Sequence, residues 1–266
     1  MSAEPIERSE AVRGGMFKVR LFEAGSGRPL LYLHGAEGLL GGWQPFLSQL
    51  ASRFQVIAPE HPGFGESSGV EQLDDVLDLI VYYLDLLDAL GLERPHLIGH
   101  DLGGMIAAEL AALAGARVGR LVLVAPLGLW IDETPVLDFF VVGRQELVAA
   151  SWHEPASAPA RRVLAPPLAE EEQRLAALQR TQNLAAAARF LWPIPDRGLE
   201  KRLHRITPPT LLVWGAEDQV VPMAYAELFE ARLPNARLEV VPNCGHHPML
   251  ERPEAFVQAV VPFLTA

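Results

Sequence analysis

The stretch His96-Leu-Ile-Gly-His-Asp-Leu-Gly-Gly-Met105 decides the expected fold. It has the pattern of a short apolar strand, a tight turn and the start of an alanine-rich helix over residues 102–114. The turn has the form Gly99-x-Asp101-x-Gly103, and a strand-to-helix elbow of this kind needs small residues beside a central side chain held in a strained backbone conformation. We therefore expect the Asp101 carboxylate to stand above the sheet, at a helix N-terminus that favours an anion. The simpler interpretation is that Asp101 is an ordinary N-cap of the helix.

Outward from this elbow, short apolar runs alternate with longer helical patterns, which is typical of a mostly parallel sheet with crossover helices. The expected strands are 17–22, 30–33, 55–58, 96–99, 121–125, 210–214 and 237–241, and the expected helices of the core include 74–90, 102–114 and 253–264. Between 127 and 206 no convincing strand occurs; a helical pattern covers 168–190, and 155–167 has the composition of an irregular link. We predict an α/β core formed by residues 1–126 and 207–266, with a helical cap at 127–206.

Composition narrows the classes of function. The 266 residues suit one core domain with a substantial insertion, and a formal net charge of −11 argues against nucleic acid as a partner. No apolar stretch approaches the roughly 20 residues that a bilayer requires, and residues 1–15 lack the apolar run of a secretory signal, so a cytoplasmic location is the default expectation. The single cysteine, Cys244, excludes an intrachain disulfide and any multi-cysteine metal site.

Three further motifs accompany the elbow. Upstream, the strand-like run 30–33 ends in His34-Gly35-Ala36. Downstream, the run 210–214 ends in a loop that carries Asp218, with Glu217 as the alternative carboxylate, and the segment 242–253 places His246 directly after a glycine. Together the four motifs resemble the α/β-hydrolase superfamily, in which the chain order is nucleophile, acid and histidine.

The resemblance implies a role for each motif. Asp101 stands where the nucleophile of the superfamily is usually serine, with Asp218 as the charge partner of the catalytic histidine. The histidine directly after glycine is the catalytic one in the superfamily, which selects His246 over His247. The backbone N–H groups of Ala36 and Leu102 are expected to form the oxyanion hole.

An aspartate nucleophile favours particular substrates. A carboxylate is already anionic at neutral pH, so Asp101 needs no base for its attack. Attack on an ester carbonyl would give a high-energy anhydride, whereas attack on an sp³ carbon bearing a halide or an epoxide oxygen gives a stable alkyl ester. His246 would then activate the water that cleaves this ester. No cofactor or metal is implied.

The Gly-His-Asp form at 99–101 resembles the epoxide hydrolase and the haloalkane or haloacetate dehalogenase branches, but their leaving-group residues match less well. All four tyrosines lie outside the expected cap, at positions 32, 82, 83 and 225. Haloalkane dehalogenases typically carry tryptophan and asparagine where this chain has Leu102 and Ala36. Side chains that could contact substrate are His34 and His100 near the motifs and Trp152, His153 and Trp192 in the cap.

Three functions follow from these residues. The first is an epoxide hydrolase or dehalogenase-type enzyme that acts on a small, mainly apolar substrate through an ester on Asp101. The second keeps the fold but cleaves ester, lactone or carbon–carbon bonds, with Asp101 acting as a base on water. The third is a noncatalytic ligand-binding protein. The expected partners are a small-molecule substrate and water, and a homodimer is left open.

Overall fold

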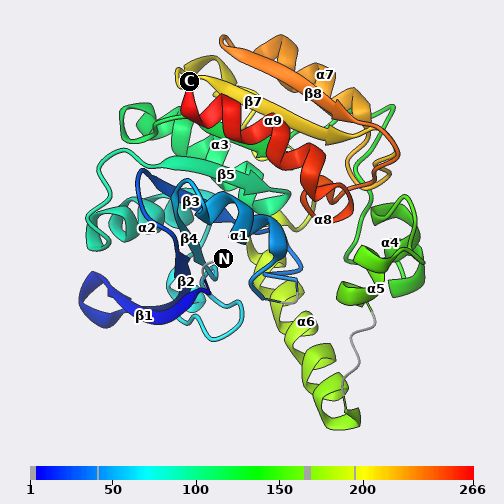
Figure 1. Cartoon of the computed structure of the whole chain (residues 1–266), viewed down its shortest axis with the longest axis horizontal. Coiled ribbons are helices and arrows are strands. Elements are labelled where there is room, and N and C mark those ends of the chain that lie inside the picture. The colour runs from blue at the N-terminus through cyan, green and yellow to red at the C-terminus, as the bar shows by residue number, and fades with distance from the viewer. Residues whose placement is uncertain (1–3, 41, 165–168, 195) are drawn as a thin grey trace.

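The computed structural model describes residues 4–40, 42–164, 169–194 and 196–266. Its centre is one eight-stranded sheet with the order β1-β2-β4-β3-β5-β6-β7-β8 (Figure 1). The strands are β1 Ile6–Val12, β2 Phe17–Ala24, β3 Pro29–Leu33, β4 Gln55–Pro59, β5 His96–His100, β6 Leu121–Val124, β7 Thr210–Gly215 and β8 Ala236–Val241. β1 and β2 pair antiparallel, as do β2 and β4, and every other neighbouring pair is parallel.

Helices cover both faces of the sheet. The helices of the described residues are α1 Pro45–Ala51, α2 Val76–Ala89, α3 Leu102–Ala114, α4 Arg144–Ser151, α5 Ala158–Leu164, α6 Glu170–Leu191, α7 Met223–Arg232, α8 Pro248–Glu251 and α9 Pro253–Thr265. Side chains of β3 alternate between two buried apolar clusters, with Leu31 and Leu33 in one and Leu30 and Tyr32 in the other. The first cluster includes apolar residues of α2, α3 and α7, and the second includes those of α1 and α9. A sheet buried on both faces explains why its central strands are continuous apolar runs.

The predicted α/β architecture is confirmed. All seven predicted strands are present within one or two residues at each end, and the predicted helix 102–114 matches α3. The strand β1 was missed, because its sequence Ile-Glu-Arg-Ser-Glu-Ala-Val has a mostly polar surface and reads as a solvated terminus. β1 forms through its antiparallel pairing with β2 at the edge of the sheet, where one partner strand is enough.

The segment 127–206 contains α4, α5 and α6 and, in its described residues, no strand. Figure 1 shows these helices gathered to one side of the sheet, with α6 running away from it. The predicted helix 168–190 corresponds to α6, although Leu168 lies outside the described residues. The prediction of an irregular link over 155–167 is wrong for 158–164, which form α5; Pro159 lies in the first helical turn, where its missing N–H costs nothing. Residues 165–167 lie outside the described part.

Two further features are the lengths of the helices and the state of the single cysteine. Among the helices in the described ranges, none has the length and apolarity needed to cross a bilayer. Cys244 is buried and carries a free thiol, and burial raises the pKa of that thiol.

Candidate active site

The elbow between β5 and α3 holds Asp101 in a conformation that is rare for a residue with a side chain. Its backbone angles are φ 54° and ψ −116°. A Cβ at Gly103 would overlap the backbone oxygen of Leu33, and one at Gly99 would overlap the backbone of Gly103. The glycines are therefore required by the close approach of helix and strand, and the packing around them maintains the strained residue between them. Asp101 makes no side-chain capping hydrogen bond, so the interpretation as an ordinary N-cap is wrong.

The two carboxylate oxygens of Asp101 have different surroundings. Oδ2 accepts a hydrogen bond of 2.7 Å from the backbone N–H of Ala36, in the loop after β3. Oδ1 is buried and has no hydrogen-bond partner in the described part of the chain. It faces Nε2 of His246 at 3.6 Å, which is an ion-pair distance but too long for a hydrogen bond. One oxygen is thus anchored, and the other has no hydrogen-bond partner in the described residues.

His246 is held from two sides. Its Nδ1 lies 2.8 Å from Oδ2 of Asp218, and its backbone N–H donates to the carbonyl of Ser151 at 2.7 Å. The other oxygen of Asp218 accepts from the backbone N–H groups of Val220 and Val221 at 2.8 and 2.9 Å. Nδ1 of His246 therefore carries a proton toward Asp218, and Nε2 is turned toward Asp101.

Charge, rather than burial, decides the protonation of this cluster. Burial alone would lower the pKa of His246, but the carboxylates of Asp218 and Asp101 raise this pKa to about 10. Burial would raise the pKa of Asp101, yet the His246 imidazolium and the Ala36 N–H bring it below its usual value. At neutral pH the site therefore holds an imidazolium between two carboxylates. His100 stays neutral, because burial and the charge of His246 lower its pKa to about 3.

A cavity opens beside these groups. Asp101, His246 and Ala36 form one part of its wall, and apolar side chains including Phe139 and Leu147 form another. In the described residues that line the cavity, neither tyrosine nor tryptophan occurs. No group of three metal-ligating side chains occurs anywhere in the described ranges.

The residues expected to contact substrate are scattered. His100 lines the cavity, and its Nε2–H donates to the backbone oxygen of His246 at 2.9 Å. Trp152 is buried behind the wall, with its ring 5.0 Å from that of His247. His153 donates its backbone N–H to Glu251. Trp192 is 49% exposed and packs on Phe140, away from the cavity.

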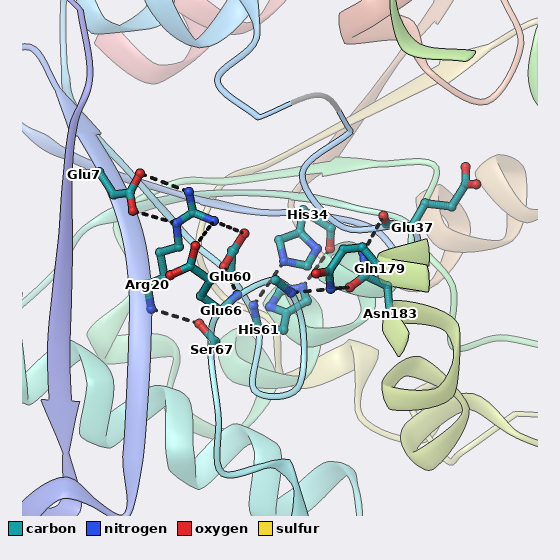
Figure 2. A network of polar contacts seen from close by, with 11 residues as sticks. Glu7, Arg20, His34, Glu37, Glu60, His61, Glu66, Ser67, Gln179 and Asn183 are labelled. Atoms are coloured by element: carbon teal, nitrogen blue, oxygen red, sulfur yellow. Dashed lines mark hydrogen bonds and ion pairs between the residues drawn. The ribbon is translucent and has the colours of Figure 1, made fainter. Parts of the chain in front are cut away.

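His34 lies beneath the loop after β3 rather than in the cavity wall. Figure 2 shows its imidazole against that of His61, with the ring centroids 3.7 Å apart. Nδ1–H of His34 donates to the oxygen of Gly35, and Nε2 accepts from the backbone N–H of His61. Asn183 of α6 donates to the backbone oxygen of Glu37 at 3.0 Å (Figure 2), so the same loop is also tied to the inserted segment. His34 thus helps to position the Ala36 N–H.

Sequence reasoning missed Glu37, Ser151 and His247, which all line the cavity. Glu37 forms an ion pair with Arg180 at 3.2 Å, and burial raises the pKa of its carboxyl. Its place directly after Ala36 was an available signal. His247 was set aside because the superfamily pattern assigns catalysis to its neighbour.

This fold, with a strained strand-to-helix elbow and a His–Asp pair at the ends of parallel strands, defines a hydrolase of the α/β class. A family model described as "Alpha/beta hydrolase family" matches residues 30–259, and the chain belongs to that family.

Among curated relatives, the chain is 28% identical to 2-hydroxy-6-oxo-6-phenylhexa-2,4-dienoate hydrolase of Burkholderia cepacia, covering 93% of this chain and 91% of the relative. It is 27% identical to 2-hydroxy-6-oxononadienedioate/2-hydroxy-6-oxononatrienedioate hydrolase of Comamonas testosteroni, with the same coverage. A solved structure of a membrane phospholipase A, described as a bacterial virulence factor, matches with a TM-score of 0.80 at 29% identity, covering 98% of this chain and 86% of that chain. These relatives support the hydrolase class but not the epoxide hydrolase or dehalogenase branches.

Proposed function

We propose that the Asp101 carboxylate attacks a carbon atom of a small, mainly apolar substrate and forms an ester that water then cleaves. The observation that carries this proposal is the unequal treatment of the two oxygens of Asp101. Oδ2 already rests on the N–H of Ala36, where the carbonyl oxygen of such an ester would lie. Oδ1 is unpartnered and belongs to a side chain that lines the cavity. The oxygen that would become the ester carbonyl is therefore already anchored before the reaction.

In the first step Oδ1 forms a bond to the substrate carbon, and the bond to the leaving group breaks with its electron pair. The new ester is neutral, so the negative charge that faced His246 is lost. Because that charge helps to raise the pKa of His246, its loss lowers this pKa. The imidazolium becomes a stronger acid and can release its Nε2 proton to the departing alkoxide of an epoxide or, when the leaving group is a halide, to water. The same histidine is then able to act as a base.

In the second step Nε2 of His246 takes a proton from water, and the hydroxide adds to the Cγ atom of the ester. The N–H groups of Ala36 and Leu102 would hold the negative charge that develops on Oδ2. Collapse releases an alcohol that carries Oδ1, and His246 returns the proton to it. Asp101 regains its second oxygen from water, and the remaining proton of that water passes from the new carboxyl group to His246, which restores the carboxylate and the imidazolium. Asp218 keeps the imidazole oriented throughout.

The inserted segment 127–206 would serve as the cap of this site. It contributes Phe139, Leu147 and Ser151 to the cavity wall. Their largely apolar surface is the reason for proposing a mainly apolar substrate, because burial of apolar substrate area supplies the binding energy.

A second candidate is hydrolysis of a carbon–carbon or ester bond beside a carbonyl group, and the curated relatives favour it. A hydroxy-oxo-dienoate contains no ester or amide, so its hydrolysis has to break a carbon–carbon bond next to a ketone. In this chain Asp101 would act as a base on a water bound beside Oδ1 and Nε2 of His246, which lie 3.6 Å apart, and the imidazolium would protonate the leaving carbon. The contact between Asp101 and Ala36 weighs against this candidate, since a substrate oxyanion would have to displace it.

Trapping the ester separates the two candidates. His246→Gln removes the base of the second step, so an ester should accumulate on Asp101. The variant is incubated separately with styrene oxide, 1-bromobutane, 4-nitrophenyl butyrate and 2-hydroxy-6-oxo-6-phenylhexa-2,4-dienoate, and intact mass and peptide mapping are recorded. We expect a substrate-sized mass increase on Asp101 with one of the first two compounds, and none in a matched Asp101→Asn, His246→Gln double variant.

Turnover of the dienoate or the aryl ester by the wild-type protein, without any adduct in His246→Gln, would instead establish the second candidate. Failure of all four compounds to react would support the noncatalytic interpretation. A single turnover of the reactive compound in ¹⁸O-water adds an independent check, since the proposal requires the label to enter the Asp101 carboxylate first.

A further inference from the structure

His247 is a buried side chain for which the proposed reaction has no use. It follows His246 and lies at the N-cap position of α8, where only 2% of its surface is exposed. Its backbone is fixed, because its carbonyl oxygen accepts hydrogen bonds from the N–H groups of Leu250 and Glu251 at 2.8 and 2.9 Å. His247 is one of the residues that line the cavity.

Both ring nitrogens of His247 are buried, and neither has a hydrogen-bond partner within the part of the chain that the structure describes. The neighbouring rings of Trp152, His100 and His246 pack 5.0 to 5.2 Å from it, centroid to centroid, which fixes its place without satisfying either nitrogen. Buried polar groups nearly always have a partner, and an unsatisfied one costs free energy of folding. Asp101 Oδ1, the proposed nucleophile, is unpartnered at the same cavity.

His247 is a neutral group. Burial, together with the neighbouring His100 and the charged His246, holds the pKa of His247 well below its usual value. A neutral imidazole offers one N–H donor and one lone pair. It supplies no charge to balance an anion, and the Asp101 carboxylate across the cavity repels one. An uncharged oxygen is the partner that fits both conditions.

We propose that His247 donates its ring N–H to an uncharged oxygen of the bound substrate, such as a carbonyl, ether or hydroxyl oxygen. This assignment rests on the proposed function only in placing the substrate in the Asp101 cavity. It makes His247 a substrate-contacting residue, and it supplies the donor that no described tyrosine or tryptophan provides in the cavity wall. Apolar neighbours such as Phe139 and Leu147 would contact the rest of the substrate.

The test compares two unreactive ligands of similar shape, acetophenone and ethylbenzene, which differ in the carbonyl oxygen. Dissociation constants are measured by calorimetry for the wild-type protein, His247→Phe and His247→Asn. The ratio of the two constants within each protein cancels the shared apolar contribution. We expect the preference for acetophenone to fall by about fivefold in His247→Phe, the usual effect of one net hydrogen bond. His247→Asn, which keeps an N–H donor, should restore part of the preference.

Two measurements guard against misfolding as the explanation. The Tm of His247→Phe should be no lower than that of the wild-type protein, because the change removes unsatisfied polar atoms from the interior. In the wild-type protein, the ¹⁵N shifts of the His247 ring should move on adding acetophenone but not on adding ethylbenzene. An unchanged preference in His247→Phe, or unmoved ring shifts, would overturn the assignment.

The proposal for His247 and the proposal for Asp101 fail separately. Neither ligand has a group that Asp101 can displace, so the binding ratio does not depend on ester formation. An absent adduct with an intact binding ratio would reject the nucleophile while retaining the donor. An adduct on Asp101, together with an unchanged binding ratio in His247→Phe, would retain the nucleophile and reject the donor.

Discussion

The protonation of His246 depends on Asp101, and Asp101→Asn measures how strongly. Asparagine has nearly the shape of aspartate but no charge, so it reproduces the charge loss that esterification would cause. The pKa of His246 stands at about 10 with both carboxylates ionised, and one of these lies 3.6 Å from Nε2. Removing an opposite charge at this distance lowers a pKa by roughly 1–3 units, equivalent to about 1.4–4 kcal/mol. His246 should then change from an acid to a base within reach of neutral pH.

The assay is a pH titration of the ring nitrogens by ¹⁵N NMR, from about pH 5 upward, on wild type, Asp101→Asn and Asp218→Asn. Asp218→Asn is the comparison, because it removes the other carboxylate and should also lower the pKa of His246. Stability gives a second readout. A raised folded-state pKa stabilises fully below pH 6.5, and this contribution is lost as pH rises through about 10. In Asp101→Asn the loss should still begin near pH 6.5, but it should be smaller and complete at a lower pH, because only the folded-state pKa is lowered. An unchanged His246 pKa in Asp101→Asn would refute the proposed change of role.

Two further predictions concern the scaffold, each with a matched control. Gly103→Ala should abolish activity and lower the free energy of unfolding by about 1–3 kcal/mol, because the added Cβ meets the backbone of β3. Gly143→Ala is the control and should fold normally, because the space around Gly143 is open. Urea unfolding measures the stability of both variants, and the trapping assay measures their activity. Arg202→Ala should lower the free energy of unfolding, measured in urea at neutral pH, by about 3 kcal/mol, because it leaves the carboxylate of Glu109 buried, at 2% exposure, without its cation. Arg174→Ala removes the cation of an exposed ion pair and should lower the free energy of unfolding by less than about 0.5 kcal/mol. Equal effects within either pair would contradict the packing or the burial argument.

The central sheet could be predicted because its strands are buried on both faces. Each of β3, β5, β6 and β7 is a short apolar run, and the pattern therefore depends little on which face a residue takes. β1 escaped prediction for the opposite reason: its register with β2, from Ile6 opposite Glu23 to Val12 opposite Phe17, is a tertiary pairing of a polar segment. α5 escaped because proline and arginine indicate a loop by composition, although both are tolerated in a short helix when the proline comes early.

The candidate site also contains residues that the sequence could predict and residues that it could not. Asp101, Asp218 and His246 could be found because each belongs to a local motif at the end of a strand, and the parallel sheet brings those ends together. Which residues form the cavity wall depends on how the inserted helices pack. Trp192 and His153 looked suitable by residue type, yet one lies at the surface and the other presents its backbone to Glu251. Residue chemistry predicts what a side chain can do, but not where an insertion places it.

The aspartate at the elbow also changes what the expected oxyanion hole would hold. When a neutral nucleophile occupies this position, the N–H of the His-Gly loop is free to bind a substrate carbonyl oxygen. Here the N–H of Ala36 is already occupied by an oxygen of the enzyme itself. A substrate carbonyl would have to compete with a carboxylate held at 2.7 Å, and charge-assisted hydrogen bonds are the stronger ones. The similarity to dienoate hydrolases and the geometry of Asp101 therefore favour different candidate reactions, and this one hydrogen bond is what distinguishes them. An enzyme that keeps it would stabilise an oxyanion made from its own side chain.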